Sequence, residues 1–172
     1  MNMTPEQNVS AEITGDREIV ISRIFDAPRK LVWKAWTDPN HISLWWGPRG
    51  FDAPPCEVDL RPGGSFLINL NGPDGNIYPC KGTFREITEP ERIVYDGPPN
   101  EPAGCGAGIP PEATVTVTFA ELGEQTELTI HTLLASEEHR VAARNEGFIE
   151  GWQQSLNRLA EELEKGATIQ ND

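Results

Sequence analysis

Large apolar side chains recur with helical spacing near the C-terminus. They follow one another at steps of three or four residues: Phe148, Trp152, Leu156, Leu159 and Leu163. Such spacing places them along one face of an α-helix. Ser136 is suited to cap the start of this helix, and Gly166 is suited to end it. The pattern therefore predicts a single amphipathic helix over residues 136–165.

The opposite face of this predicted helix is polar, and we expect its side chains to face water: Glu150, Asn157, Arg158, Glu161, Glu162 and Glu164. Gly147 and Gly151 lie one turn apart within the helix. A glycine in a helix interior costs about 1 kcal/mol relative to alanine, so it is kept where another group approaches the backbone. The pair indicates either tight packing on a sheet or room above a cavity.

Residues 17–134 show the alternation of apolar and polar side chains that is typical of β-strands. Strands are predicted over residues 17–25, 50–60, 65–71, 77–87, 92–95, 112–121 and 126–134. Turn sequences such as Pro62-Gly63-Gly64 and Gly72-Pro73-Asp74-Gly75 separate neighbouring strands. Strands joined by such short connections must be antiparallel.

Two short helices are predicted after the first strand. Pro28 suits the first position of a helix that carries Leu31 and Trp36, and Asp38 suits the cap of a second helix. The order of elements predicts one α+β domain over residues 17–165, in which the C-terminal helix covers the apolar face of an antiparallel sheet. Residues 1–16 and 166–172 are expected to form a flexible arm and a flexible tail. Residues 96–111, rich in proline and glycine, are expected to form a long mobile loop.

Short motifs across residues 17–164 resemble those of a known family. They are Phe25-Asp26-Ala27-Pro28-Arg29, Trp36-Thr37-Asp38-Pro39, Trp45-Trp46-Gly47-Pro48, Arg61-Pro62-Gly63-Gly64, Gly72-Pro73-Asp74-Gly75, Pro90-Glu91-Arg92 and Gly151-Trp152. Together they are similar to the START-like (Bet v 1-type, SRPBCC) superfamily, in the branch related to the C-terminal domain of the heat-shock-protein-90 ATPase activator. The resemblance implies a helix-grip fold, a curved sheet around a long helix, with a hydrophobic cavity between them. It implies no single activity.

Aromatic and apolar side chains are the candidates to line such a cavity: Trp45, Trp46, Phe66, Ile68, Tyr78, Phe84, Val117, Phe119, Phe148 and Trp152. Four of the five tryptophans lie in the short-helix region. Core packing accounts for most of them. A tryptophan-rich helix pair at the mouth of a cavity also suits recognition of a flat apolar ligand.

The chain is acidic, with 14 basic and 27 acidic residues and a net charge of −13. Such a surface repels phosphate backbones and anionic lipids, so we expect neither nucleic acid nor membrane as a partner. No apolar run approaches the roughly 20 residues of a membrane span, which favours a cytoplasmic protein. Cys56, Cys80 and Cys105 form no Cys-x-x-Cys pair. We expect reduced thiols, with a Cys56–Cys80 disulfide as the open alternative.

No metal or nucleotide motif is present, and we expect no cofactor and no bound metal. Glu57, Asp59 and Arg61 alternate on one predicted strand. They are candidates for a general base with an anchored partner, but a surface ion-pair ladder and a brace for the following turn are the simpler interpretation. No catalytic residue is therefore assigned.

The leading hypothesis is a non-enzymatic protein that holds a small apolar or aromatic molecule between sheet and helix. One alternative is an interaction protein that stimulates a chaperone ATPase, which only the resemblance supports. Another is a cyclase- or hydrolase-type enzyme that uses Glu57 or Asp59, which would require a carboxylate facing the cavity. Homodimerisation is a further open alternative.

Overall fold

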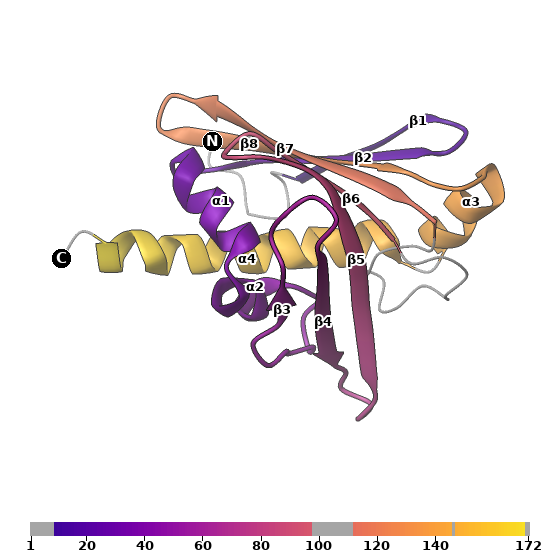
Figure 1. The fold of residues 1–172 in the computed structure, drawn as a ribbon, viewed down its shortest axis with the longest axis horizontal. Helices are drawn as coiled ribbons and strands as arrows, with labels where there is room; N and C mark the ends of the chain where they lie inside the picture. Colours follow the sequence, from indigo (N-terminus) through magenta and orange to yellow (C-terminus); the bar gives the residue numbers. More distant parts are fainter. Residues whose placement is uncertain (1–8, 98–111, 146, 171–172) are drawn as a thin grey trace.

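A curved antiparallel sheet wraps around one long helix in the computed structural model, which describes residues 9–97, 112–145 and 147–170 (Figure 1). The strands are β1 (Val9–Gly15), β2 (Glu18–Phe25), β3 (Glu57–Val58), β4 (Ser65–Asn71), β5 (Ile77–Thr88), β6 (Arg92–Asp96), β7 (Thr114–Leu122) and β8 (Gln125–Leu133). The helices are α1 (Arg29–Thr37), α2 (Pro39–Trp45), α3 (Glu137–Asn145) and α4 (Phe148–Gln170). The predicted α+β, helix-grip architecture is confirmed.

The strand order in the sheet is β1-β2-β8-β7-β6-β5-β4-β3, and every neighbouring pair is antiparallel. Strands far apart in sequence are neighbours in this order, because β2 pairs with β8 and brings Ile21 opposite Ile130. Helices α1 and α2 lie beside α4 at one end of the sheet, while α3 lies at the other end (Figure 1).

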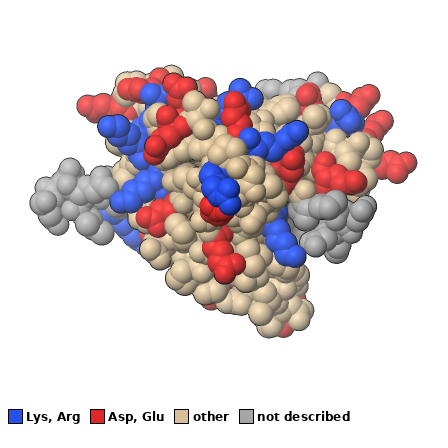
Figure 2. All heavy atoms as spheres, viewed as in Figure 1, with Lys and Arg blue, Asp and Glu red and all other residues tan. Residues whose placement is uncertain are grey.

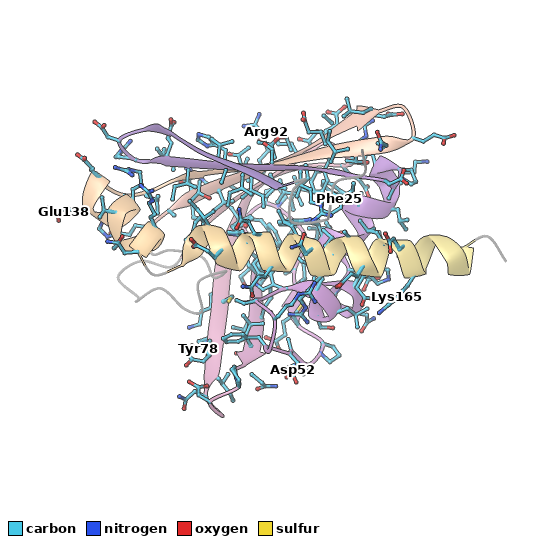
Figure 3. All side chains as sticks on the ribbon, turned by 180° about the vertical axis from the view of Figure 1, so that it is seen from behind. Phe25, Asp52, Tyr78, Arg92, Glu138 and Lys165 are labelled. Carbon is cyan, nitrogen blue, oxygen red and sulfur yellow. The ribbon has the colours of Figure 1, made fainter. Side chains whose placement is uncertain are left out.

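Alternation of side chains decides which face of the sheet meets α4. In β7, Val115, Val117 and Phe119 are buried, whereas the threonines between them are half-buried. The predicted stripe of α4 is buried in full, from Phe148 to Leu163. Apolar side chains removed from water on both elements stabilise the fold. Figure 3 shows side chains filling the space between sheet and helix.

The prediction of one unbroken C-terminal helix is wrong. The chain forms α3 and α4, and Gly147 between them has φ +88°. Glycine adopts this left-handed conformation without a Cβ clash, which ends one helix and redirects the chain. Gly147 then accepts a hydrogen bond at its carbonyl from the Gly151 N–H (2.8 Å) in the first turn of α4. Ser136 caps α3, accepting at Oγ from the His139 N–H (3.1 Å).

Three further boundaries differ from expectation. Residues 9–15 of the expected arm form β1, because their pairing with β2 satisfies backbone groups that would otherwise need water. Gly166 does not end α4, which runs to Gln170. The strand expected over residues 50–60 is reduced to Glu57–Val58. Residues 98–111, most of the expected loop, lie outside the described residues.

Candidate ligand-binding site

Tryptophans from three helices pack together beside the sheet. Trp36 of α1 stacks on Trp152 of α4 with ring centroids 5.7 Å apart and planes 9° apart. It also meets Trp45 and Trp46 at the end of α2, with centroids 5.0 and 5.7 Å away. Trp46 in turn contacts Trp152 edge-on at 5.1 Å. This tryptophan cluster, Trp36, Trp45, Trp46 and Trp152, joins α1, α2 and α4 into one wall.

The facing wall consists of aromatic rings on β4, β5 and β6. Phe66 packs against Phe84, with centroids 5.1 Å apart, and edge-on against Tyr95 at 5.2 Å. Gly82 of β5 lies directly beneath the Phe66 ring, and a Cβ built there would lie 2.5 Å from Phe66 Cζ. A glycine in a strand interior commonly marks such a close approach. The absent side chain therefore sets the position of the Phe66 ring.

A small, partly open void of about 20 Å³ lies between the two walls. Its lining is uncharged and mostly apolar: Trp36, Ile42, Trp46, Val58, Phe66, Ile68, Phe84, Ile93 and Tyr95. A void of this size holds roughly one water molecule, whereas small-molecule pockets are typically about 300–1,000 Å³. Side chains thus nearly fill the interior at this point, and a ligand requires the two walls to move apart.

Four of the ten residues proposed from sequence line this void: Trp46, Phe66, Ile68 and Phe84. Five others are buried in the surrounding core: Trp45, Val117, Phe119, Phe148 and Trp152. Tyr78 lies apart, half-buried near the tip of β4 and β5, where its ring meets Phe51 and its hydroxyl bonds Asp74 (Figure 3). That these ten residues contact a ligand remains a prediction.

Trp36 and Tyr95 are lining residues that the sequence did not single out as such. Trp36 was visible in the helical pattern, and Tyr95 in the strand over residues 92–95. Neither pattern indicates which apolar positions border a void, because that depends on how the helices meet the sheet.

Three buried polar atoms of the lining residues have no hydrogen-bond partner within the described part of the chain: Trp36 Nε1, Trp46 Nε1 and Tyr95 Oη. By contrast, Trp45 Nε1 donates to the Ala35 carbonyl at 2.9 Å. Leaving a buried polar group unpaired costs about 1–3 kcal/mol. Burial, and then the nearby Cys80 thiol, raise the pKa of Tyr95 far above its ordinary value, so its hydroxyl stays protonated.

The raised pKa of Tyr95 predicts a loss of stability in alkali. Above pH 10 the unfolded chain loses the tyrosine proton while the folded chain keeps it, so stability falls as pH rises, by at most about 1.4 kcal/mol per pH unit. Urea unfolding at pH 9 and pH 11 should show a smaller drop for Tyr95→Phe than for wild type. Tyr78→Phe, at a half-buried site, is the control. Equal drops for wild type and Tyr95→Phe would contradict the prediction.

Polar side chains of α4 hold the segment that carries Trp46. Arg158 donates to the carbonyls of Gly47 (2.9 Å), Pro48 (3.2 Å) and Leu44 (3.3 Å), and Ser155 Oγ accepts from the Gly47 N–H at 3.0 Å. A cation at this position satisfies carbonyls at the C-terminal end of α2. The expectation that the polar face of α4 is wholly solvated is therefore wrong. Asn157 is also buried, because it accepts a hydrogen bond from Arg23 of β2.

Arg158→Ala is expected to lower the free energy of unfolding by about 1–2 kcal/mol, because it removes the side-chain donor to the Gly47 and Leu44 carbonyls near Trp46. Arg49→Ala is the control, since its pair with Glu161 is largely exposed and such pairs contribute about 0–1 kcal/mol. Chemical denaturation of both variants measures the difference. Equal losses would mean that the carbonyl contacts of Arg158 contribute little.

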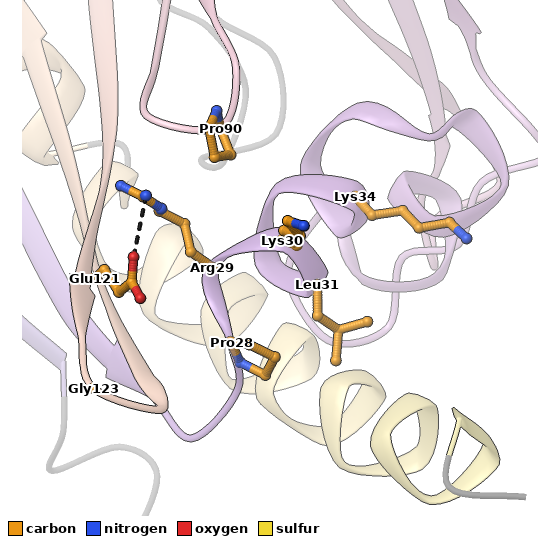
Figure 4. Close-up of a pocket in the computed structure, with 8 residues that line it drawn as sticks. All are labelled: Pro28, Arg29, Lys30, Leu31, Lys34, Pro90, Glu121 and Gly123. Atoms are coloured by element: carbon orange, nitrogen blue, oxygen red, sulfur yellow. Dashed lines mark ion pairs between the residues drawn. The ribbon is translucent and has the colours of Figure 1, made fainter.

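A separate surface groove lies between the start of α1 and the turns that follow β5 and β7 (Figure 4). It has a volume of about 490 Å³, and an adjoining hollow of about 540 Å³ shares Lys30, Lys34 and Pro90 with it. Arg29 in the groove pairs with Glu121 at 3.2 Å. Charges of both signs are likewise interspersed on the face seen in Figure 2. The groove is thus open and of mixed charge, and it indicates no ligand class.

The candidate catalytic residues do not line the void between the two walls. Glu57, Asp59 and Arg61 are exposed, and Arg61 Nε donates to Asp59 at 2.9 Å beside the turn that they were expected to brace. Cys56 and Cys80 are not joined in a disulfide, and burial raises the pKa of Cys56 to about 11. Cys105 lies outside the described residues. A carboxylate facing the cavity, which the enzyme alternative requires, is not provided by Glu57 or Asp59.

Within the described residues, no group of three His, Cys, Asp or Glu side chains is arranged to hold a metal ion. The helices of that same part of the chain include none with the length and apolar character of a membrane span.

Comparison with known proteins agrees with this architecture. A protein from Nitrosomonas europaea is 26% identical, with a TM-score of 0.79 over 91% of this chain and 99% of its own. A protein from Mycobacterium smegmatis is 27% identical, with a TM-score of 0.76 over 90% and 96% of the two chains. CalU16 from Micromonospora echinospora is 25% identical, with a TM-score of 0.61 over 90% and 83%. No curated protein matches the chain significantly.

The family model described as "Activator of Hsp90 ATPase homolog 1-like protein" matches residues 26–164. This span runs from the end of β2 through most of α4, and so includes both walls of the void. The chain therefore belongs to the Activator of Hsp90 ATPase homolog 1-like family of START-like proteins.

Proposed function

We propose that this protein binds a small apolar or aromatic molecule between the tryptophan cluster and the aromatic wall of β4, β5 and β6. The observation that carries the proposal is the uncharged, aromatic-lined void between these walls. An aromatic ligand would bind more favourably in such surroundings than an aliphatic one, because offset and edge-to-face ring contacts add to the free energy of apolar burial. Membership of a family that generally binds hydrophobic ligands supports the same function.

The wall next to α2 is the side that we expect to move when a ligand enters. Residues 46–56 follow α2 without regular secondary structure, apart from the single bridge between Asp52 and Asn71. Beyond them, β3 contributes only two residue pairs to the sheet. A shift of this segment would displace Trp46 and Val58, which both line the void. In this interpretation the ligand binds a conformation in which the two walls lie further apart than they do in the structure.

Binding of a small aromatic probe, naphthalene, tests the proposal. Titration should change the tryptophan fluorescence of the wild type and raise its melting temperature, because a ligand of the folded state stabilises it. Ile68→Phe should abolish both responses, since the larger side chain fills the void that Ile68 lines. Ile24→Phe is the matched control, because Ile24 is exposed on β2. Unchanged binding by Ile68→Phe would place the probe elsewhere and contradict the proposal.

Two partners considered from sequence, a chaperone and a second copy of the chain, find no comparable support. Among the residues that the structure describes, the exposed large apolar side chains come from separate segments of the chain: Ile24, Leu44, Leu60, Ile77, Leu122 and Val141. Interaction surfaces usually present such side chains as one contiguous patch. The family description names an ATPase activator, and stimulation of a purified chaperone ATPase is the assay for that role.

A further inference from the structure

We propose that the molecule bound in this site is neutral and carries a hydrogen-bond acceptor, such as a carbonyl oxygen, which receives N–H or O–H groups of Trp36, Trp46 and Tyr95. The inference rests on the proposed function and adds the chemical class of the ligand. It predicts discrimination between a ketone and a hydrocarbon of similar size.

The evidence is a concentration of unpaired donors at one void. Trp36, Trp46 and Tyr95 are 5%, 3% and 2% exposed, yet Nε1 of each indole and Oη of the tyrosine lack a partner within the residues that the structure describes. More than about 90% of buried polar groups in proteins have a partner, so three exceptions around one void call for an explanation. All three side chains line the same void, and they come from α1, the end of α2 and β6.

The types of these groups define the complementary ligand. An indole N–H donates and does not accept, so Trp36 and Trp46 require an acceptor. The Tyr95 hydroxyl is also able to donate. An anion would supply acceptors as well, but the lining contributed by the described residues contains no Lys, Arg or His to balance its charge. Burying an unpaired charge is far more costly than burying a neutral carbonyl, which excludes a carboxylate or phosphate here.

A single water molecule is the competing partner for these groups. The void of about 20 Å³ is large enough to hold one. A ligand that reproduces the hydrogen bonds of an ordered water keeps their contribution, whereas one that displaces the water without replacing them loses affinity. The relevant comparison is therefore between two probes of similar size, one with a carbonyl oxygen and one without.

Acetophenone and isopropylbenzene form such a pair, because a carbonyl oxygen in one replaces a methyl group in the other. In ¹H–¹⁵N spectra of the intact protein, acetophenone should shift the indole N–H signals of Trp36 and Trp46 downfield. Isopropylbenzene should not produce this downfield shift. The indole of Trp45 is the internal control, since its N–H already donates to Ala35. Tryptophan-to-phenylalanine variants assign the signals.

Tyr95→Phe provides the second measurement, because it removes only the hydroxyl. We expect it to weaken acetophenone binding about 3- to 10-fold and to leave the dissociation constant of isopropylbenzene unchanged. If both probes bind equally well to wild type and Tyr95→Phe and no indole signal moves downfield, the acceptor proposal is wrong while the proposed function stands. If neither probe binds to the wild type or shifts its signals, both proposals are overturned.

Discussion

Leu156→Ala is expected to lower the free energy of unfolding by about 3–5 kcal/mol, a large part of the 5–15 kcal/mol that stabilises a typical domain. Leu156 lies at the centre of the apolar stripe of α4 and is 0% exposed. The substitution removes apolar contacts and leaves a cavity in the core that side chains around it refill only partly. Thermal or urea unfolding measures the loss.

Leu44→Ala provides the matched control, because Leu44 also lies in a helix but is 53% exposed. Surface substitutions of this kind usually change stability by no more than about 0.5 kcal/mol. A loss for Leu156→Ala as small as that for Leu44→Ala would mean that α4 is not packed on the sheet as described.

Gly82→Ala is expected to destabilise the protein by about 2–3 kcal/mol and to abolish ligand binding. The new Cβ would lie 2.5 Å from Cζ and 2.6 Å from Cε1 of Phe66, and 3.1 Å from the Asp96 carbonyl oxygen. Because the backbone oxygen is fixed by the sheet, the Phe66 ring must give way. Its displacement toward the void would occupy the volume that a ligand needs.

A double-mutant cycle with Phe66→Ala isolates this clash. Without the ring, Gly82→Ala should cost little, so the two substitutions should be strongly non-additive. Gly15→Ala is the control for adding a methyl group to an exposed glycine, since its nearest neighbour is the flexible Glu18 carboxylate at 3.1 Å. A cost for Gly82→Ala that is the same with and without Phe66 would show that the ring is not responsible.

Local side-chain patterns predicted most of the fold. Alternation in β7 and β8 and the stripe from Phe148 to Leu163 correctly indicated a sheet covered by a helix. The break at Gly147 was not predicted, because a helical glycine and a glycine with positive φ look alike in sequence. The strand β1 was missed as well, since its residues are ordered by pairing with β2 rather than by an apolar pattern of their own.

The site was predicted less completely, for a physical reason. Periodicity identified Phe66 and Phe84 as inward-facing, but many inward positions are core and few border the void. Trp36 and Tyr95 differ from Trp45 in their hydrogen bonding, and that depends on which carbonyls the fold brings within reach. Partners of Arg158 and Asn157, more than a hundred positions away in sequence, were equally invisible to local patterns.

The pairing of β2 with β8 has a consequence for synthesis of the chain. Ser22 and Thr129 face each other across these strands although they are 107 residues apart in sequence. During translation from the N-terminus, β2 lacks this neighbour until β8, which ends at Leu133 of the 172 residues, has left the ribosome, and α4 emerges later still. Contacts of such long range also slow folding. In a nascent or truncated chain that lacks α4, the apolar face of the sheet is therefore exposed to water. We expect such a chain to aggregate more readily than the complete protein.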